Sequence, residues 1–203
     1  MADSDASLTV GYLPTQLGKE DAVAVLNRRG LSFLRRLFRL QATACIDSSR
    51  VHLVWMPQYL IDLSIESDKG NAIQQVTLDA WSGVFALWNI KEPLVTGLPD
   101  GESFLPRMGV EAGVAKAVLA LTNTTLHMRG QKGKPHVTGH DSVQLLYYPY
   151  WVYYFERKKG LLDMKIVDGA MGERPGNQVK RGILEAFIDA STAEKPDGLS
   201  PNP

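Results

Sequence analysis

Residues 51–65 show the clearest alternation of apolar and polar positions in the chain. In the second half of this stretch, Ile61 and Leu63 alternate with Asp62 and Ser64, which is the two-residue period of a strand with one buried and one wet face. Other runs predict further strands over residues 42–47, 73–78, 84–88, 143–157 and 161–167. Because polar turns separate most of these runs, we expect the strands to pair antiparallel.

A period near 3.6 residues predicts helices in four further segments. These segments span residues 20–26, 31–40, 110–122 and 178–190. The third has Val110, Val114 and Val118 on one face, and its alanines and Gly113 would let a helix approach a sheet closely. The fourth follows Asn177, a residue type that caps helix N-termini.

The segment 31–40 is sharply two-sided. Leucine and phenylalanine residues fill one half of its circumference, and arginines gather on the other half. The candidate partner-binding residues on this arginine face are Arg28, Arg29, Arg35, Arg36 and Arg39. One interpretation is a core-packed helix with a solvated side, and the other is a surface that binds phosphates, acidic protein or lipid headgroups.

The stretch from Val51 to Val84 recurs, with different residues in the same roles, from Val143 to Glu173. Each copy has a proline flanked by aromatic residues, then a polar Lys-Gly turn and an Asp-x-x-x-Gly turn. An internal repeat indicates that the fold is built from similar units, whatever the roles of single residues. It predicts an α+β fold of two similar halves related by a pseudo-twofold duplication, each a helix packed on a three- to four-stranded antiparallel sheet.

Composition divides the chain into five parts. Residues 91–107 contain three prolines and several glycines, which predicts a linker. The end of the chain has further prolines and no apolar face, which predicts disorder. The predicted organisation is an N-terminal segment 1–19, a first α+β repeat 20–90, a linker 91–107, a second repeat 108–190 with the C-terminal helix, and a tail 191–203.

Aromatic residues crowd the proline of the second copy. The candidate partner-binding residues at this aromatic bend are Tyr148, Tyr150, Trp151, Tyr153 and Tyr154. In one interpretation they pack a helix onto the sheet, and in the other they form a groove for a peptide or a small ligand. Neighbouring strand residues point to opposite faces, so these rings cannot all be buried on one face.

Asp79 and Asp168 precede Gly83 and Gly172 by four residues each. This spacing predicts a turn in which the aspartate accepts hydrogen bonds from backbone N–H groups and the glycine takes a left-handed conformation. We interpret both carboxylates as structural rather than catalytic, because the turn alone explains both residue types.

Charge and cysteine content exclude several function classes. The 22 basic residues balance the 22 acidic ones, so no global field favours nucleic acid. A single cysteine, Cys45, allows no internal disulfide, and the acidic N-terminus lacks the pattern of a secretory signal. No apolar run approaches the roughly 20 residues of a membrane span. These features predict a globular, cytoplasmic protein.

The sequence contains no recognisable catalytic, metal or cofactor motif. His136 and His140 have the spacing of two metal ligands on a helix, but Pro135 and Gly139 disfavour a helix there. The glycine-rich residues 130–133 lack the features of a phosphate loop. We therefore expect no metal, no cofactor and no enzymatic activity.

Val167–Glu173, which reads Val-Asp-Gly-Ala-Met-Gly-Glu, resembles the last hairpin of PepSY-like modules. Thr77–Val84 is the corresponding stretch of the first copy, with Leu78 in the place of the valine. The resemblance covers two modules in tandem, residues 20–90 and 108–190. It implies a non-enzymatic α+β module that inhibits or regulates partner proteins such as peptidases, in a family whose members are usually exported or membrane-attached.

Together these patterns predict a non-catalytic protein-binding or regulatory module. It would bind an unidentified protein through sheet edges, the aromatic bend or the arginine face, and the same edges would allow a homodimer. Two alternatives stay open. One is a small-molecule binding protein, or weak enzyme, with a ligand site between the two halves, and the other is a peripheral membrane adaptor.

Overall fold

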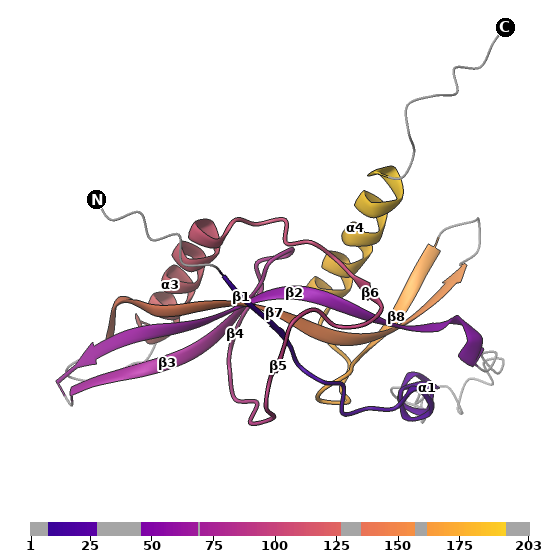
Figure 1. The fold of residues 1–203 in the computed structure, drawn as a ribbon, viewed down its shortest axis with the longest axis horizontal. Helices are drawn as coiled ribbons and strands as arrows, with labels where there is room; N and C mark the ends of the chain where they lie inside the picture. Colours follow the sequence, from indigo (N-terminus) through magenta and orange to yellow (C-terminus); the bar gives the residue numbers. More distant parts are fainter. Residues whose placement is uncertain (1–7, 28–45, 69, 127–134, 157–161, 194–203) are drawn as a thin grey trace, which may run out of the picture.

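The computed structural model describes residues 8–27, 46–68, 70–126, 135–156 and 162–193 (Figure 1). The arginine face, and most of the predicted strand 42–47, lie outside the described residues. The predicted α+β class is confirmed, because the described elements are three α-helices and one mixed sheet.

Eight strands form a single sheet in the described part of the chain. They are β1 (Thr9–Tyr12), β2 (Val51–Ser67), β3 (Gly70–Asp79), β4 (Phe85–Leu87), β5 (Val95–Thr96), β6 (Glu102–Ser103), β7 (His136–Glu156) and β8 (Leu162–Asp168). Their order is β4-β3-β2-β7-β1-β5, with β6 beside β2 and β8 beside β7. The β1–β7 and β2–β6 pairs are parallel, and the other pairs are antiparallel. The sequence predicted an antiparallel sheet in each half and left open whether the two are continuous. The β2–β7 pair joins all described strands into one mixed sheet.

Prolines lie in both central strands, at positions where the outer partner strand changes. On its outer side, β2 pairs with β6 up to Trp55 and with β3 from Gln58 onward. Between them, the Pro57 carbonyl accepts a hydrogen bond from the backbone N–H of Ala80. The Pro149 carbonyl likewise accepts from the N–H of Gly169. The missing N–H of a proline is tolerated at such a gap, because no ladder hydrogen bond is lost.

Alternation along the strands assigns each helix to a face of the sheet. Helices α1 (Lys19–Asn27) and α3 (Val110–Leu126) pack on the same face of the sheet. On this face, α1 covers Trp151 and α3 covers Tyr59. Helix α4 (Asn177–Ala193) packs on the other face, which carries Tyr150. Figure 1 shows α3 and α1 at opposite ends of the twisted sheet. The 3-10 turn η1 (Ser48–Arg50) leads into β2.

Helix α3 lies close to the sheet, as its small residues predicted. A Cβ atom on Gly113 would lie 2.7 Å from Cδ2 of Tyr59, so a larger residue would push the helix away. The predicted alternation in β2 is also confirmed, because Ile61 and Leu63 are fully buried while Asp62 and Ser64 are half-buried.

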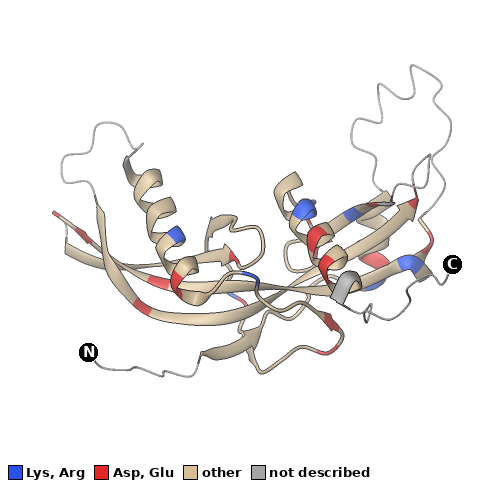
Figure 2. Cartoon of the chain, turned by 90° about the horizontal axis from the view of Figure 1, so that it is seen from above, with Lys and Arg blue, Asp and Glu red and all other residues tan. Residues whose placement is uncertain are grey.

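The segment predicted as a linker, residues 91–107, contributes two short strands to the sheet. β5 pairs with β1, and β6 pairs with β2. Phe104, just after β6, is buried and packs against Phe187 of α4 with ring centroids 4.9 Å apart. Charged positions of both signs are scattered over the described elements (Figure 2), in keeping with the balanced composition.

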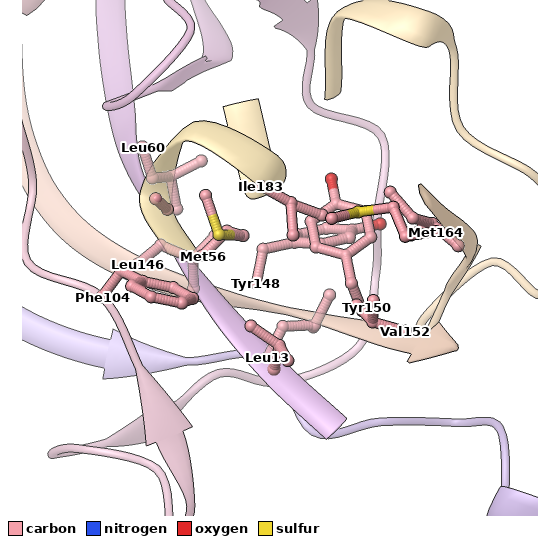
Figure 3. Packing of buried hydrophobic residues seen from close by; sticks show 13 residues of the cluster. Leu13, Met56, Leu60, Phe104, Leu146, Tyr148, Tyr150, Val152, Met164 and Ile183 are labelled. Carbon is pink, nitrogen blue, oxygen red and sulfur yellow. The ribbon is translucent and has the colours of Figure 1, made fainter. Parts of the chain in front are cut away.

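The core under α4 contains the residues that border the site described below. Tyr148 and Tyr150 lie next to each other on this face, with ring centroids 5.2 Å apart, and Ile183 of α4 covers them (Figure 3). Met164 of β8 closes the same cluster on one side. Burial of this kind contributes about 1.5–3 kcal/mol for each large apolar side chain.

Candidate functional site

The reversal after β3 is built around the Asp79 carboxylate. Asp79 Oδ1 accepts hydrogen bonds from the backbone N–H groups of Trp81 (2.9 Å) and Ser82 (2.7 Å). The N–H of Gly83 donates to the Asp79 carbonyl at 2.8 Å, and Gly83 has φ of 68°. The predicted capped turn with a left-handed glycine is therefore confirmed at Asp79.

The reversal after β8 has the same construction around Asp168. Its Oδ1 accepts from the N–H groups of Ala170 (2.9 Å) and Met171 (2.8 Å). The N–H of Gly172 donates to the Asp168 carbonyl at 2.9 Å, and Gly172 has φ of 70°. The second predicted turn is confirmed as well.

Both aspartates border one cavity of about 200 Å³, which we call the two-turn cavity. It opens on the face of the sheet that α4 covers. Its polar lining residues are Gln58, Thr77, Asp79, Tyr148, Tyr150 and Asp168. The polar Asn89 also lines the wall. The other lining side chains are apolar, among them Trp88 after β4, Val179 of α4 and the exposed Leu87 and Met171.

Burial raises the pKa of both carboxyl groups above the ordinary value of 3.8. At Asp79, the turn N–H groups of Ser82 and Trp81 oppose this rise, because they stabilise the ionised form. At Asp168, the N–H groups of Met171 and Ala170 and the Tyr148 hydroxyl oppose it.

The two tyrosines of the cavity keep their protons well above neutral pH. Burial raises the pKa of Tyr148, and the nearby Asp168 carboxylate raises it further. Burial likewise raises the pKa of Tyr150, against a side-chain hydrogen bond with Gln58. The cavity therefore combines hydroxyl and amide groups with two carboxylates, and its described lining includes no lysine or arginine.

The structure separates the aromatic residues that the sequence grouped together. Tyr148 and Tyr150 are 6% and 4% exposed and line the two-turn cavity, while Trp151 is 8% exposed and lies on the opposite face under α1. Helix α4 covers Tyr148 and Tyr150, and helix α1 covers Trp151. Tyr153 and Tyr154 are half-buried, and Tyr154 packs against Phe187 of α4.

Sequence reasoning missed Gln58, whose side chain is nearly buried beside Tyr150. The sequence could have indicated this residue, because Gln58 is the one amide in the otherwise apolar run 53–61. A buried polar side chain in such a run needs a hydrogen-bond partner and therefore indicates a polar pocket.

The described residues contain neither a cluster of metal ligands nor a membrane-spanning helix. No three histidine, cysteine, aspartate or glutamate side chains within them are arranged as metal ligands. His136 and His140 lie on β7, and His136 Nε2 lies 3.5 Å from Glu66 Oε2. Among the helices that the structure describes, none has the length and apolar character needed to cross a membrane.

Comparison with models of protein families, with curated proteins and with solved structures finds no match for this chain. The resemblance to PepSY-like modules stays a prediction.

Proposed function

We propose that the chain is a duplicated α+β unit whose two copies interlock to form a non-catalytic binding protein. The first support is the matched construction of the turns at Asp79 and Asp168. The second is that each turn anchors the segment leading into a helix. The N–H groups of Gln16 and Leu17 donate to the Gly169 carbonyl, and those of Arg107 and Met108 donate to the Ala80 carbonyl.

A third support is a pair of long side-chain hydrogen bonds in corresponding places. The Trp151 indole Nε1 donates to the Leu17 carbonyl, two residues before α1 begins. The Tyr59 hydroxyl donates to the Met108 carbonyl, two residues before α3 begins. In this proposal, α1 packs on β7 and β8 of the other copy, while α3 packs on β2 and β3 of the other copy and also on β7 of its own.

We propose that the two-turn cavity is the binding site and that it receives a small organic ligand. The observation that carries this proposal is a cavity bordered by corresponding aspartates of the two copies. Its polar floor offers hydroxyl, amide and carboxylate groups, and its rim offers the exposed apolar Leu87 and Met171. A concave site with an apolar wall and a few convergent polar groups is the common form of a small-ligand site.

The ligand class follows from charge. The described lining includes Asp79 and Asp168 but no cationic side chain, so it favours a neutral or cationic ligand over an anion. The proposal is non-catalytic because each aspartate uses Oδ1 to hold two backbone N–H groups of its own turn. Moving either carboxylate to act on a substrate would break the turn.

A thermal-shift screen of neutral and cationic metabolites on the full chain tests this function. A ligand of the folded state raises the melting temperature by mass action. Calorimetry then measures how tightly each hit binds the wild type and the variant Ala86→Phe. Ala86 is an exposed residue of β4 that lines the cavity, so the substitution places an aromatic ring at the cavity wall. The matched control is Ala115→Phe, at an exposed position of α3.

We expect Ala86→Phe to weaken binding at least tenfold and Ala115→Phe to leave it unchanged. A screen without hits, or a hit that binds Ala86→Phe as tightly as the wild type, would reject the cavity as the binding site.

A second candidate function, binding of a protein partner, is supported by the outer edge of β3. β4 pairs only with Val76–Leu78, so the edge from Gly70 to Gln74 has no partner strand among the described residues. Residues 70–78 contain no charged side chain and no proline, and Ile73 is 65% exposed. An uncharged open edge is a template for pairing with another strand.

A further inference from the structure

A second cavity of about 430 Å³ lies between the Asp79 turn, α3 and α4. Ser82 and Gly83 contribute from the turn, Lys116 from α3, and Gln178, Arg181 and Glu185 from α4. We call it the Lys116 cavity. The Asp79 turn separates it from the two-turn cavity, and the Val84 side of the turn borders both. Figure 2 shows the basic positions of α3 and α4 in blue.

Lys116 lies directly over the turn. A Cβ atom built on Gly83 would overlap its Nζ, so the glycine leaves the room that the ammonium group occupies. Lys116 forms no hydrogen bond or ion pair with another described residue. Its charge acts through space on Asp79, where it opposes the rise in pKa that burial causes.

The turn itself does not require this cation. The matching turn at Asp168 has the same backbone hydrogen bonds, yet the side chain near its Gly172 is the apolar Leu17. An apolar neighbour is therefore sufficient to build such a turn. The charge of Lys116 is an addition at the first turn only.

Other charges around the cavity leave it net positive. Arg181 Nε donates to Glu185 Oε1 at 2.7 Å, and Arg107 Nη1 lies 3.7 Å from Glu185 Oε2. One carboxylate is thus shared by two guanidinium groups, while Lys116 on the opposite wall forms no ion pair with a described residue. Arg107 also lies over the Trp81 ring, at 5.7 Å from its centroid, and this ring lines the cavity.

We propose that the Lys116 cavity binds a small oxyanion, carried by a phosphate or a carboxylate group. The oxyanion would lie between the Lys116 ammonium and the Nη groups of Arg181, which form no hydrogen bond with another described residue. The Gln178 amide would be a further donor. Charge-assisted hydrogen bonds from lysine and arginine are the usual recognition of both groups. This site differs in sign from the two-turn cavity, so the two would not compete for one ligand.

NMR titration of the ¹⁵N-labelled full chain tests the proposal. The probes are sodium phosphate, sodium acetate and, at matched ionic strength, sodium chloride. We expect saturable shifts of the Gly83 and Gly182 amides with phosphate, with acetate or with both, and none with chloride. Phosphate alone would identify a phosphoryl ligand, and a response to acetate would identify a carboxylate ligand.

Variants locate the site. Lys116→Met and Arg181→Gln should each weaken binding at least fivefold, while Lys91→Met, at an exposed position outside the cavity, should not. Ala86→Phe should leave oxyanion binding unchanged, which distinguishes this site from the two-turn cavity. Equal shifts with chloride, or unchanged binding in both Lys116→Met and Arg181→Gln at unaltered melting temperature, would overturn the proposal.

Discussion

The Tyr148 hydroxyl lies 3.0 Å from both carboxylate oxygens of Asp168 and donates its proton to that group. Tyr148 is 6% exposed, so water does not replace this bond readily. The bond links the second turn to the centre of the sheet, because Tyr148 pairs with Met56 in the middle of the β2–β7 ladder.

Removal of the Tyr148 hydroxyl should lower stability. We expect Tyr148→Phe to reduce the free energy of unfolding by about 1.5–3 kcal/mol, the range for a hydrogen bond to a charged group. The matched control is Tyr154→Phe, because the buried Tyr154 hydroxyl has no hydrogen-bond partner in the described structure. Tyr154→Phe should leave stability unchanged or raise it. Urea unfolding measures both, and equal losses in the two variants would contradict the argument.

The pH dependence of the free energy of unfolding should reflect the raised pKa of the buried Asp79 carboxyl. Burial raises its folded pKa above the ordinary 3.8, and Asp79 is 4% exposed. The folded state therefore holds this proton more tightly than the unfolded chain. The resulting stabilisation is fully present below the unfolded pKa and is lost as pH rises through the folded pKa.

Asp79→Asn keeps an oxygen for the turn N–H groups but does not titrate. We therefore expect the stability difference between wild type and variant to shift in favour of the wild type as pH falls from 7 to 3.5. Urea unfolding at several pH values provides the measurement. A constant difference, or a shift in favour of the variant, would show that burial does not raise this pKa.

The close contact of α3 with Tyr59 predicts an unusual response to alanine. In an ordinary helix interior, glycine to alanine stabilises by about 1 kcal/mol. Gly113→Ala should instead destabilise by about 1–3 kcal/mol, because its Cβ would overlap the Tyr59 ring. Gly109→Ala, where a Cβ meets nothing within 4 Å, should change stability by under about 0.5 kcal/mol. Adding Tyr59→Leu should recover part of the loss, and strictly additive effects would argue against a clash.

The open edge of β3 predicts that two copies of the chain pair through this strand, and that a charged residue introduced at the edge prevents the pairing. If β3 binds a second copy, the wild type should dimerise with rising concentration, as measured by light scattering after size exclusion. Ile73→Lys places a charge on the edge and should abolish the dimer. Leu119→Lys, at a similarly exposed apolar position of α3, should not. If the wild type stays monomeric at all concentrations, β3 does not bind a second copy of the chain.

Local patterns predicted much of the fold. The Asp-x-x-x-Gly spacing predicted both turns, and the alternation in β2 predicted its buried face. The single sheet was not predictable in this way. β1, β5 and β6 have four, two and two residues, too few for a periodic signal, and their positions depend on contacts with distant strands.

The candidate sites were predicted only in part. The sequence predicted Tyr148 as a binding residue and the two aspartates only as turn residues. Their convergence on one cavity depends on the β2–β7 pairing, which no local pattern encodes. Lys116 carries no sequence signal, since one lysine on a helix is ordinary. Its position over Gly83 becomes visible only in three dimensions.

The hydrogen bond from Trp151 to Leu17 joins residues 134 positions apart. As the ribosome releases the chain from its N-terminus, α1 leaves the exit tunnel long before β7 and β8 have been translated. Its apolar face therefore lacks the cover of Trp151 and Val167 until both strands have been translated. Cells that make this protein face a long interval of exposure, during which a holdase chaperone would be most useful.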